Sequence, residues 1–189
     1  MIPLLHQDQS NTKSHLTARD IRAVAGAFAY GLLIYSIVGP SLTDYGNYLA
    51  YAEFSQEILS RRAGDGFLNL LVNEPIWLFI NIILGDFLAP QEVVRTLAVI
   101  SGAVVSFLTF KFIKRDWLFA IIILLFPIIL KNHLIHLRQG VAVALFLAGF
   151  MSEHRSRGML LMAAAPLVHV SFFFILFIWV ALEALKILR

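Results

Sequence analysis

VVRTLAVISGAVVSFLTFKFI, residues 93–113, is the stretch that decides the fold. It is long and apolar enough to cross the hydrocarbon core of a bilayer, which takes roughly 20 residues of α-helix. Five further apolar stretches lie on either side of it, at residues 23–39, 76–89, 117–130, 133–151 and 159–185. The chain is therefore predicted to be an all-α, polytopic integral membrane protein with about five to six transmembrane helices, one of them short or re-entrant.

The composition agrees with this fold class. Hydrophobic residues make up 59% of the chain and charged residues 14%, with a mean hydropathy of +0.80. Soluble domains have about 45–50% apolar and about 25% charged residues, so an ordinary soluble enzyme is disfavoured. The absence of cysteine excludes disulfides, thiol catalysis and thiolate metal sites. The net charge of +3, without a clustered basic face, indicates no nucleic-acid partner.

Residues 1–20 are predicted to be a flexible, cytoplasmic N-terminal segment, and residues 21–189 to be the transmembrane helical domain. The first residues are polar and contain no apolar run, so they do not form a cleaved signal peptide. Arg19 and Arg22 precede the first apolar stretch and, by the positive-inside rule, keep the N-terminus in the cytoplasm.

An outer loop rich in acidic residues is predicted at residues 40–75. Within it, apolar residues at helical spacing from Tyr45 to Leu59 predict an amphipathic helix along the outer membrane surface. Ser41 or Thr43 is expected to cap this helix and Gly64 to end it.

The topology has two interpretations. Basic loops at residues 111–115 and 154–157 are predicted to face the cytoplasm, which places residues 131–136 outside. Residues 76–89 number only about 14, short of the roughly 20 that a span needs. They form either a short or re-entrant segment that enters and leaves on the outer side, or an ordinary hairpin whose basic loop faces outward, against the charge rule.

Arg138 is the leading candidate for a functional residue, because a charge inside an apolar segment costs roughly 2.5–3.5 kcal/mol and needs a reason. With an outer turn near Lys131 and Asn132, it would lie about one to two helical turns inside the membrane. Its guanidinium suits a phosphate or diphosphate. Alternatively, it extends to the outer headgroups or pairs with a carboxylate. His136 and Gln139 flank it and are candidates for binding the same ligand.

His169 is expected in the middle of the last apolar stretch. A neutral imidazole there could relay a proton or contact a sugar hydroxyl, or it could make only an interhelical hydrogen bond.

Two acidic residues, Asp44 and Glu74, lie near predicted helix starts at the two ends of the outer loop. They either complement the helix dipoles or include a general base for a sugar hydroxyl. Tyr45, Tyr48 and Tyr51 either stack on sugar rings or form an interfacial aromatic belt.

Other site types have little support in the sequence. His133 and His136 have no third ligand at a usual spacing, so no metal site is predicted. No phosphate-binding glycine loop, nucleophile elbow or dinucleotide motif is present. No inverted repeat is evident, which disfavours a small transporter.

Four short motifs occur in order along residues 39–174: Gly39-Pro40-Ser41-Leu42-Thr43-Asp44 followed by Tyr48, then Asn73-Glu74-Pro75, then Arg138-Gln139-Gly140-Val141-Ala142, then His169-Val170-Ser171. Together they resemble the EpsG-type, Wzy-like polymerases of bacterial exopolysaccharide and O-antigen synthesis. In those proteins the pattern is Asp-x-x-x-Tyr, Glu-Pro, Arg-Gln-x-x-Ala and His-x-Ser on successive helices.

The resemblance implies glycosyl transfer between polyprenyl-diphosphate-linked oligosaccharides at the outer face of a bacterial plasma membrane. Arg138 would then bind the diphosphate leaving group, Asp44 or Glu74 would position or deprotonate the acceptor hydroxyl, and His169 would line the cavity. The expected partners are the lipid-linked oligosaccharide, the bilayer and other polysaccharide-assembly membrane proteins. No metal or other cofactor is needed, because arginine can stabilise the departing charge.

Family members are generally longer, so the resemblance predicts either the N-terminal half of such a polymerase or a shortened relative. A second hypothesis follows from this length difference. The chain would then be a non-catalytic membrane partner, or modulator, of a polysaccharide polymerase, and would bind lipid-linked sugar without turning it over.

Overall fold

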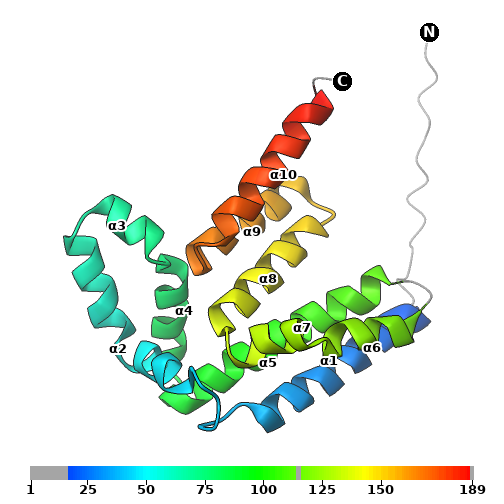
Figure 1. Ribbon diagram of the computed structural model, residues 1–189, viewed down its shortest axis with the longest axis horizontal. Coiled ribbons are helices and arrows are strands. Elements are labelled where there is room, and N and C mark those ends of the chain that lie inside the picture. The colour runs from blue at the N-terminus through cyan, green and yellow to red at the C-terminus, as the bar shows by residue number, and fades with distance from the viewer. Residues whose placement is uncertain (1–16, 114–115, 188–189) are drawn as a thin grey trace, which may run out of the picture.

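The computed structural model describes residues 17–113 and 116–187, and every regular element in these ranges is a helix. The N-terminal prediction for residues 1–20 lies outside the described residues as far as residue 16. In chain order the helices are α1 Ala18–Ile37, α2 Tyr45–Gly64, α3 Phe67–Val72, α4 Pro75–Gly85, α5 Pro90–Phe112, α6 Trp117–Leu125, α7 Pro127–Leu134, α8 Leu137–Phe150, α9 Arg155–Val168 and α10 Phe172–Ile187 (Figure 1).

The long helices α1 and α5 pack side by side in opposite directions (Figure 1). Near the start of α1, Asp20 pairs with Lys111 at the end of α5, 2.9 Å apart. At the other end, the guanidinium of Arg95 lies 5.5 Å from the ring centre of Tyr35. Gly102 permits the close approach of the two helices, because an added Cβ would lie 3.2 Å from the Ile34 side chain.

This antiparallel pair determines where the intervening segment lies. Residues 38–89 leave the end of α1 and return to the start of α5, so they begin and end at the same end of the pair. Within them, α4 has 11 residues and is about 16 Å long, against a hydrocarbon core of about 30 Å. The structure therefore favours the first interpretation of residues 76–89, a short segment that does not carry the chain across.

Two described helices, α1 and α5, are long and apolar enough to cross a membrane, and the bent pair α6–α7 would be a third span if it counts as one. The described part of the chain is therefore all-α, with helices that have the length and composition of membrane spans. The higher count of about five to six spans stays a prediction, because α8, α9 and α10 are shorter apolar helices.

Two of the predicted continuous segments are broken. The helix expected over residues 117–130 bends by 58° between α6 and α7, because Phe126 precedes Pro127 and is forced into an extended conformation. The last apolar run divides into α9 and α10 shortly after Pro166, which lacks the N–H that a continuous helix needs. His169 is extended and forms the C-cap of α9, so its expected place in the middle of a span was wrong.

The predicted outer turn at Lys131 and Asn132 was also wrong, because both residues lie in α7. The carbonyl of Lys131 accepts hydrogen bonds from the N–H groups of Ile135 and His136, which carries the helix to Leu134. Arg138 consequently lies in the first turn of α8.

The predicted amphipathic helix of the outer loop is α2, and it ends at Gly64 as expected. Asp44, not Ser41 or Thr43, occupies its N-cap position, without a side-chain capping bond. Its apolar face, with Tyr45, Tyr48 and Ala52, is buried in the common core, where α2 contacts α4 and α5. That face is therefore covered by protein.

Candidate functional site

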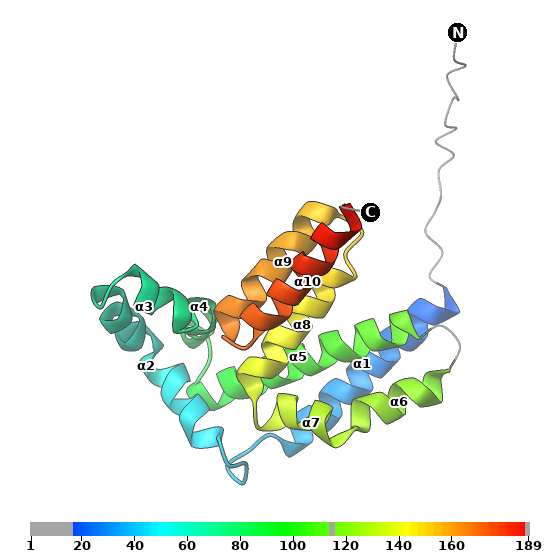
Figure 2. The ribbon, with the colours of Figure 1, turned by 45° about the horizontal axis from the view of Figure 1, so that its top comes forward.

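Three helix ends bring together the side chains of Glu74, Arg138 and His169, which we call the ion cluster. Glu74 precedes α4, Arg138 lies in the first turn of α8, and His169 ends α9. Helices α8 and α9 pack as an antiparallel hairpin, and α4 lies beside the C-terminal end of α9 (Figure 2). Residues up to 95 positions apart in the chain are thus in direct contact.

Glu74 is the centre of the ion cluster and is only 6% exposed. One carboxylate oxygen, Oε2, accepts a hydrogen bond from Nη1 of Arg138. The other, Oε1, lies 2.7 Å from Nδ1 of His169 and 3.3 Å from the backbone nitrogen of Val170. Both oxygens are therefore engaged by donors from α8 and from the α9–α10 connection.

The backbone at Glu74 is in the left-handed region, with φ 59° and ψ 56°. It is the one non-glycine residue with positive φ among those the structure describes. A non-glycine residue pays roughly 1–3 kcal/mol for a sparsely populated conformation, and such strain is concentrated at functional sites. The following Pro75 disfavours a right-handed helical conformation at this position. The strained backbone places the carboxylate where α8 begins and α9 ends.

Aromatic side chains form one wall of the site. The Arg138 guanidinium lies 5.2 Å from the ring centre of Tyr51, within range of a cation–π contact. Trp77 meets both Tyr48 and Tyr51 edge-on, with ring centres 5.9 and 6.4 Å away. The Tyr48 hydroxyl donates to the carbonyl of Ile135 over 3.0 Å, which ties α2 to the turn before α8. Tyr48 thus positions the turn that carries Arg138.

A second acid–imidazole pair lies beside the ion cluster. Nδ1 of His136 is 3.8 Å from Oδ2 of Asp44, and both side chains are partly exposed. Gln139 follows Arg138 on α8 and is half-buried, and within the described part of the chain it makes no hydrogen bond to the cluster. Asp44 and His136 are therefore near the site without contacting Glu74.

The charge of Glu74 is set by opposing effects. Burial alone would raise the pKa of this carboxyl, but the hydrogen bond from His169 and the charge of Arg138 outweigh burial and hold the pKa below its ordinary value of 4.5. Burial raises the pKa of the Tyr48 hydroxyl, which stays neutral as a donor. Because an ionised carboxylate only accepts hydrogen bonds, Nδ1 of His169 carries a proton. In the neutral tautomer with its proton on Nδ1, Nε2 is the nitrogen that accepts a proton.

The charged groups of the site can hold an anion and accept a proton. No group of three metal-ligating side chains occurs in residues 17–113 and 116–187. Arg138 keeps its positive charge at any relevant pH, and 32% of its side chain is exposed. A guanidinium has five N–H donors, so the bond to Glu74 leaves others for an anionic ligand.

An apolar groove of about 400 Å³ begins one turn beyond Arg138 on α8. It lies between α4, α5 and α8, and its lining includes Ile83, Leu97 and Val141. Arg138, Val141 and Leu145 lie three and seven residues apart on α8, so the charged residue and the groove share one helix face.

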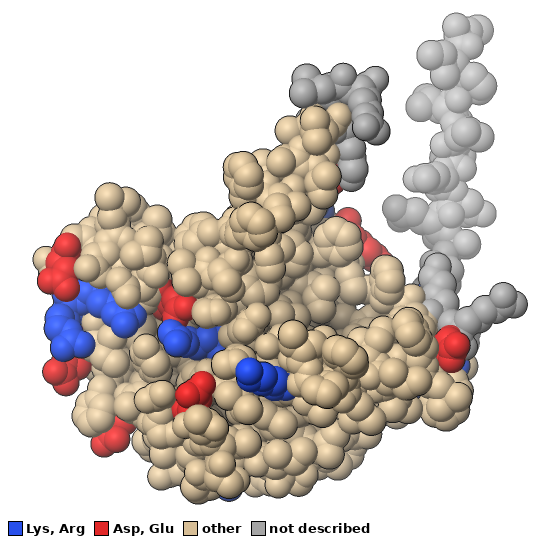
Figure 3. Space-filling model, in the orientation of Figure 1, with Lys and Arg blue, Asp and Glu red and all other residues tan. Residues whose placement is uncertain are grey.

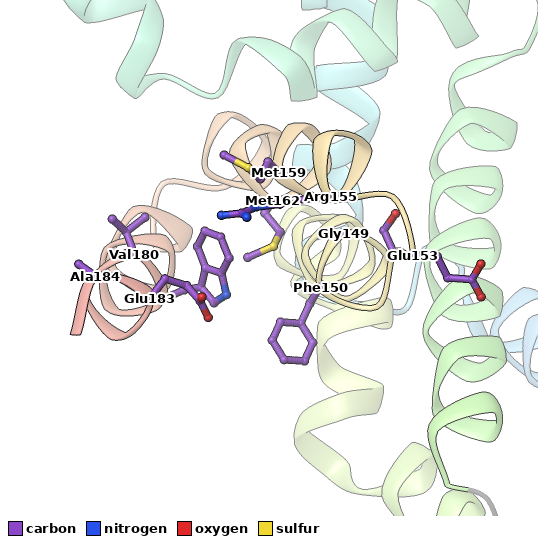
Figure 4. A pocket seen from close by; sticks show the side chains of 12 residues that line it. Gly149, Phe150, Glu153, Arg155, Met159, Met162, Val180, Glu183 and Ala184 are labelled. Carbon is purple, nitrogen blue, oxygen red and sulfur yellow. The ribbon is translucent and has the colours of Figure 1, made fainter. Parts of the chain in front are cut away.

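A separate cavity of about 600 Å³ lies at the opposite end of the α8–α9 hairpin, between α8, α9 and α10 (Figure 4). Its lining includes Phe150, Met159 and Met162, and it shares no residue with the ion cluster. This cavity, whose lining also includes Glu153, Arg155 and Glu183, is therefore distinct from the ion cluster.

The sequence analysis identified the three charged or titratable members of the ion cluster, and the structure shows its alternative for Arg138, pairing with a carboxylate, but the partner Glu74 and the contact of Glu74 with His169 were not predicted. It also did not identify Trp77 or the backbone N–H of Val170 as parts of the site. Trp77 follows the Glu74-Pro75 motif by two residues, which is a usable signal for a wall residue. A backbone donor leaves no signal in residue type, because every residue except proline has one.

No family model, no curated protein and no solved structure matches the chain.

Proposed function

We propose that the chain is a membrane glycosyltransferase that extends a polyprenyl-diphosphate-linked oligosaccharide, with Arg138 holding the diphosphate of the donor. The observation that carries the proposal is the placement of Arg138. It is held between Glu74 and Tyr51, remains one-third exposed, and lies at the head of an apolar groove. A diphosphate joined to a long hydrocarbon chain has the matching arrangement of charge and apolar surface.

The roles of the acidic residues follow from their contacts. Both oxygens of Glu74 already accept hydrogen bonds, so Glu74 acts as a positioning residue that orients Arg138 and His169. His169, with Nδ1 bonded to Glu74, is the general base through Nε2. Asp44 is more exposed and is the second candidate for contact with the acceptor sugar.

The proposed step is a displacement at the anomeric carbon of the donor sugar. The acceptor hydroxyl oxygen forms the new glycosidic bond, and its proton goes to Nε2 of His169. The bond between the anomeric carbon and the diphosphate oxygen breaks, and the diphosphate leaves with the electron pair. Arg138 stabilises the additional negative charge on that oxygen.

The orientation proposed for the chain is a cytoplasmic N-terminus and an ion cluster at the outer face of a bacterial plasma membrane. Arg19, Arg22, Lys111, Arg155 and Arg157 lie at the helix ends away from the cluster, whereas Arg61, Arg62, Arg95 and Lys131 lie toward the cluster's end. The arginines that flank the start of the first apolar helix support a cytoplasmic N-terminus by the positive-inside rule.

A second candidate function is non-catalytic binding of lipid-linked sugar as a partner of a polysaccharide polymerase. The observation that favours it is that the members of the ion cluster are already hydrogen-bonded to one another, since the Glu74 carboxylate bonds to both Arg138 and His169. A cluster that is complete without substrate suits a static binding site as well as a catalytic one.

The test is turnover by the purified chain in proteoliposomes that contain a polyprenyl-diphosphate-linked oligosaccharide, with glycan length read by mass spectrometry. We expect the wild type to lengthen the glycan and Arg138→Ala to abolish lengthening, with partial activity in Arg138→Lys.

Arg95→Ala is the matched control, because Arg95 also pairs with a carboxylate and lies over a tyrosine ring, through Glu92 and Tyr35. It should retain wild-type turnover. Binding of the lipid-linked sugar without any lengthening by the wild type would favour the second candidate.

A further inference from the structure

The short helix α3 presents exposed apolar side chains at the tip of the outer segment. None of its six residues is buried. Phe67 and Leu68 at its start are each 74% exposed, and Val72 at its end is 52% exposed. Large apolar side chains at the tip of a hairpin indicate a surface that is covered by something outside the chain.

The tip is held in a defined position. Gly66 has φ 106°, a conformation that suits glycine, and it turns the chain sharply from α2 into α3. Nη1 of Arg62 donates to the carbonyl of Asn73 over 2.5 Å, and the Asn73 side chain donates to the carbonyl of Asn69 over 2.8 Å. The end of α2 and the end of α3 are therefore tied together, and the apolar tip is presented by a closed structure.

The segment that contains α3, residues 38–89, is joined at both of its ends to the same end of the α1–α5 pair (Figure 1). Since α1 and α5 are long enough to span the hydrocarbon core, their ends lie at the lipid headgroups.

The composition and the size of this surface indicate lipid as the occupant. At the α2–α3 corner, at the left of Figure 3, Arg61 and Arg62 end α2 and lie among acidic side chains, with exposed Glu57 and Asp65 close to them in the sequence. A charged rim beside exposed apolar side chains suits a membrane interface, where the charged groups stay in the headgroup region and the apolar ones enter the hydrocarbon. A stable protein interface takes about 800 Å² from each partner, which three side chains on six residues cannot supply.

We propose that α3 is an interfacial membrane anchor: Phe67 and Leu68 enter the edge of the hydrocarbon core, and Arg61 faces the lipid phosphates. The sequence pattern had assigned membrane contact to the apolar face of α2, but that face is buried against α4 and α5. The anchor is instead the next helix along. It ends two residues before Glu74, so it holds the entry to α4 at a fixed depth. This proposal does not depend on the proposed reaction.

The test uses the cysteine-free chain as its own background. Leu68→Cys and, in a second variant, Phe67→Cys carry a nitroxide spin label in nanodiscs of phosphatidylcholine and phosphatidylglycerol. Oxygen, which concentrates in the hydrocarbon core, and nickel-EDDA, which stays in water, compete as relaxing agents. Two further labelled positions give reference values for the ratio of relaxation by oxygen to relaxation by nickel-EDDA. Ile122→Cys, on the apolar helix α6 where Ile122 is 62% exposed, is the lipid reference, and Glu57→Cys, on the exposed face of α2, is the water reference.

We expect the labels at 67 and 68 to be relaxed several-fold more by oxygen than by nickel-EDDA, as at 122, with the opposite preference at 57. A nickel preference at 67 and 68 equal to that at 57 would overturn the proposal. So would labels shielded from both agents or broadened by a second label, because these outcomes indicate cover by protein or by another copy. Because no residue of α3 is buried, the substitutions leave the packing intact, which unfolding temperatures of the unlabelled variants check.

Discussion

At the residue scale, Glu74 is the residue that holds the ion cluster together, because it contacts Arg138, His169 and Val170. The sequence placed it at a helix start and offered two roles, a cap or a general base. It is at the N-cap position of α4 but makes no capping bond, and its carboxylate instead turns toward α8 and α9. The contacts depend on a left-handed backbone and on a donor from Val170, and neither is encoded by a local pattern. Residue types were thus predictable, and their partners were not.

Glu74→Gln should lower the free energy of unfolding by roughly 1.5–3 kcal/mol at neutral pH, because hydrogen bonds to a charged group are lost. The pKa of Glu74 is held below 4.5 in the folded chain, so its ionised form stabilises the fold fully above about pH 4.5. As pH falls through the lowered pKa, this contribution is lost. In detergent, the difference in unfolding temperature between the wild type and Glu74→Gln should therefore become smaller below about pH 4.5. A difference that stays constant down to about pH 3 would contradict an ionised, hydrogen-bonded Glu74.

His169→Asn separates the structural from the chemical role of the imidazole. An asparagine amide can donate near the position of Nδ1 and keep the bond to Glu74, but it has no group at the position of Nε2. We expect near-normal unfolding temperature and a loss of turnover of roughly 10²–10⁴-fold, the range for general-base catalysis. Unchanged turnover in this variant would exclude His169 as the base.

At the element scale, most helices follow from the apolar pattern, whereas their breaks do not. The helices α2 and α5 lie where the sequence predicts them. The bend at Pro127 was visible as a proline, but its size of 58° depends on how α6 and α7 pack against α5. The break at His169 had a weaker signal, because prolines such as Pro166 are tolerated in membrane helices. These breaks place the functional side chains at helix ends.

Gly140→Ala should disturb the α7–α8 hairpin and with it the position of Arg138. An added Cβ would lie 2.9 Å from Nδ1 of His133 and closer still to the backbone oxygen of Asn132. Overpacking of this kind costs roughly 1–3 kcal/mol, measured as unfolding free energy in detergent. The control is Gly46→Ala on α2, where an added Cβ meets nothing within 4 Å and the substitution should be neutral or stabilising. Equal stabilities for the two variants would refute the packing argument.

At the scale of the whole molecule, the antiparallel pair α1–α5 favours one of the two interpretations of residues 76–89 between which the distribution of charges did not choose. Residues 76–89 could be read as a re-entrant segment or as a full hairpin, because both readings use the same apolar residues. The contacts Asp20–Lys111 and Tyr35–Arg95 join opposite ends of two separate helices. Such long-range contacts depend on tertiary packing, which no local pattern encodes.

Cysteine labelling in intact membranes tests this topology. Glu57 lies on the exposed face of α2 and Asp86 is the exposed C-cap of α4, so Glu57→Cys and Asp86→Cys should react with an impermeant maleimide from the same side. Glu153→Cys, in the connection between α8 and α9, should react only after the membrane is permeabilised. Labelling of 57 and 86 from opposite sides would mean that α4 crosses the bilayer.

The central claim is that Arg138 holds the diphosphate of a lipid-linked donor, and the dissociation constant for a synthetic polyprenyl diphosphate tests it most directly. Removing a charge-assisted hydrogen bond of roughly 1.5–3 kcal/mol should weaken binding by about 10- to 100-fold in Arg138→Ala. Arg95→Ala, with the same kind of carboxylate and aromatic neighbours, should bind as the wild type does. Equal affinities for the wild type and Arg138→Ala would contradict the claim.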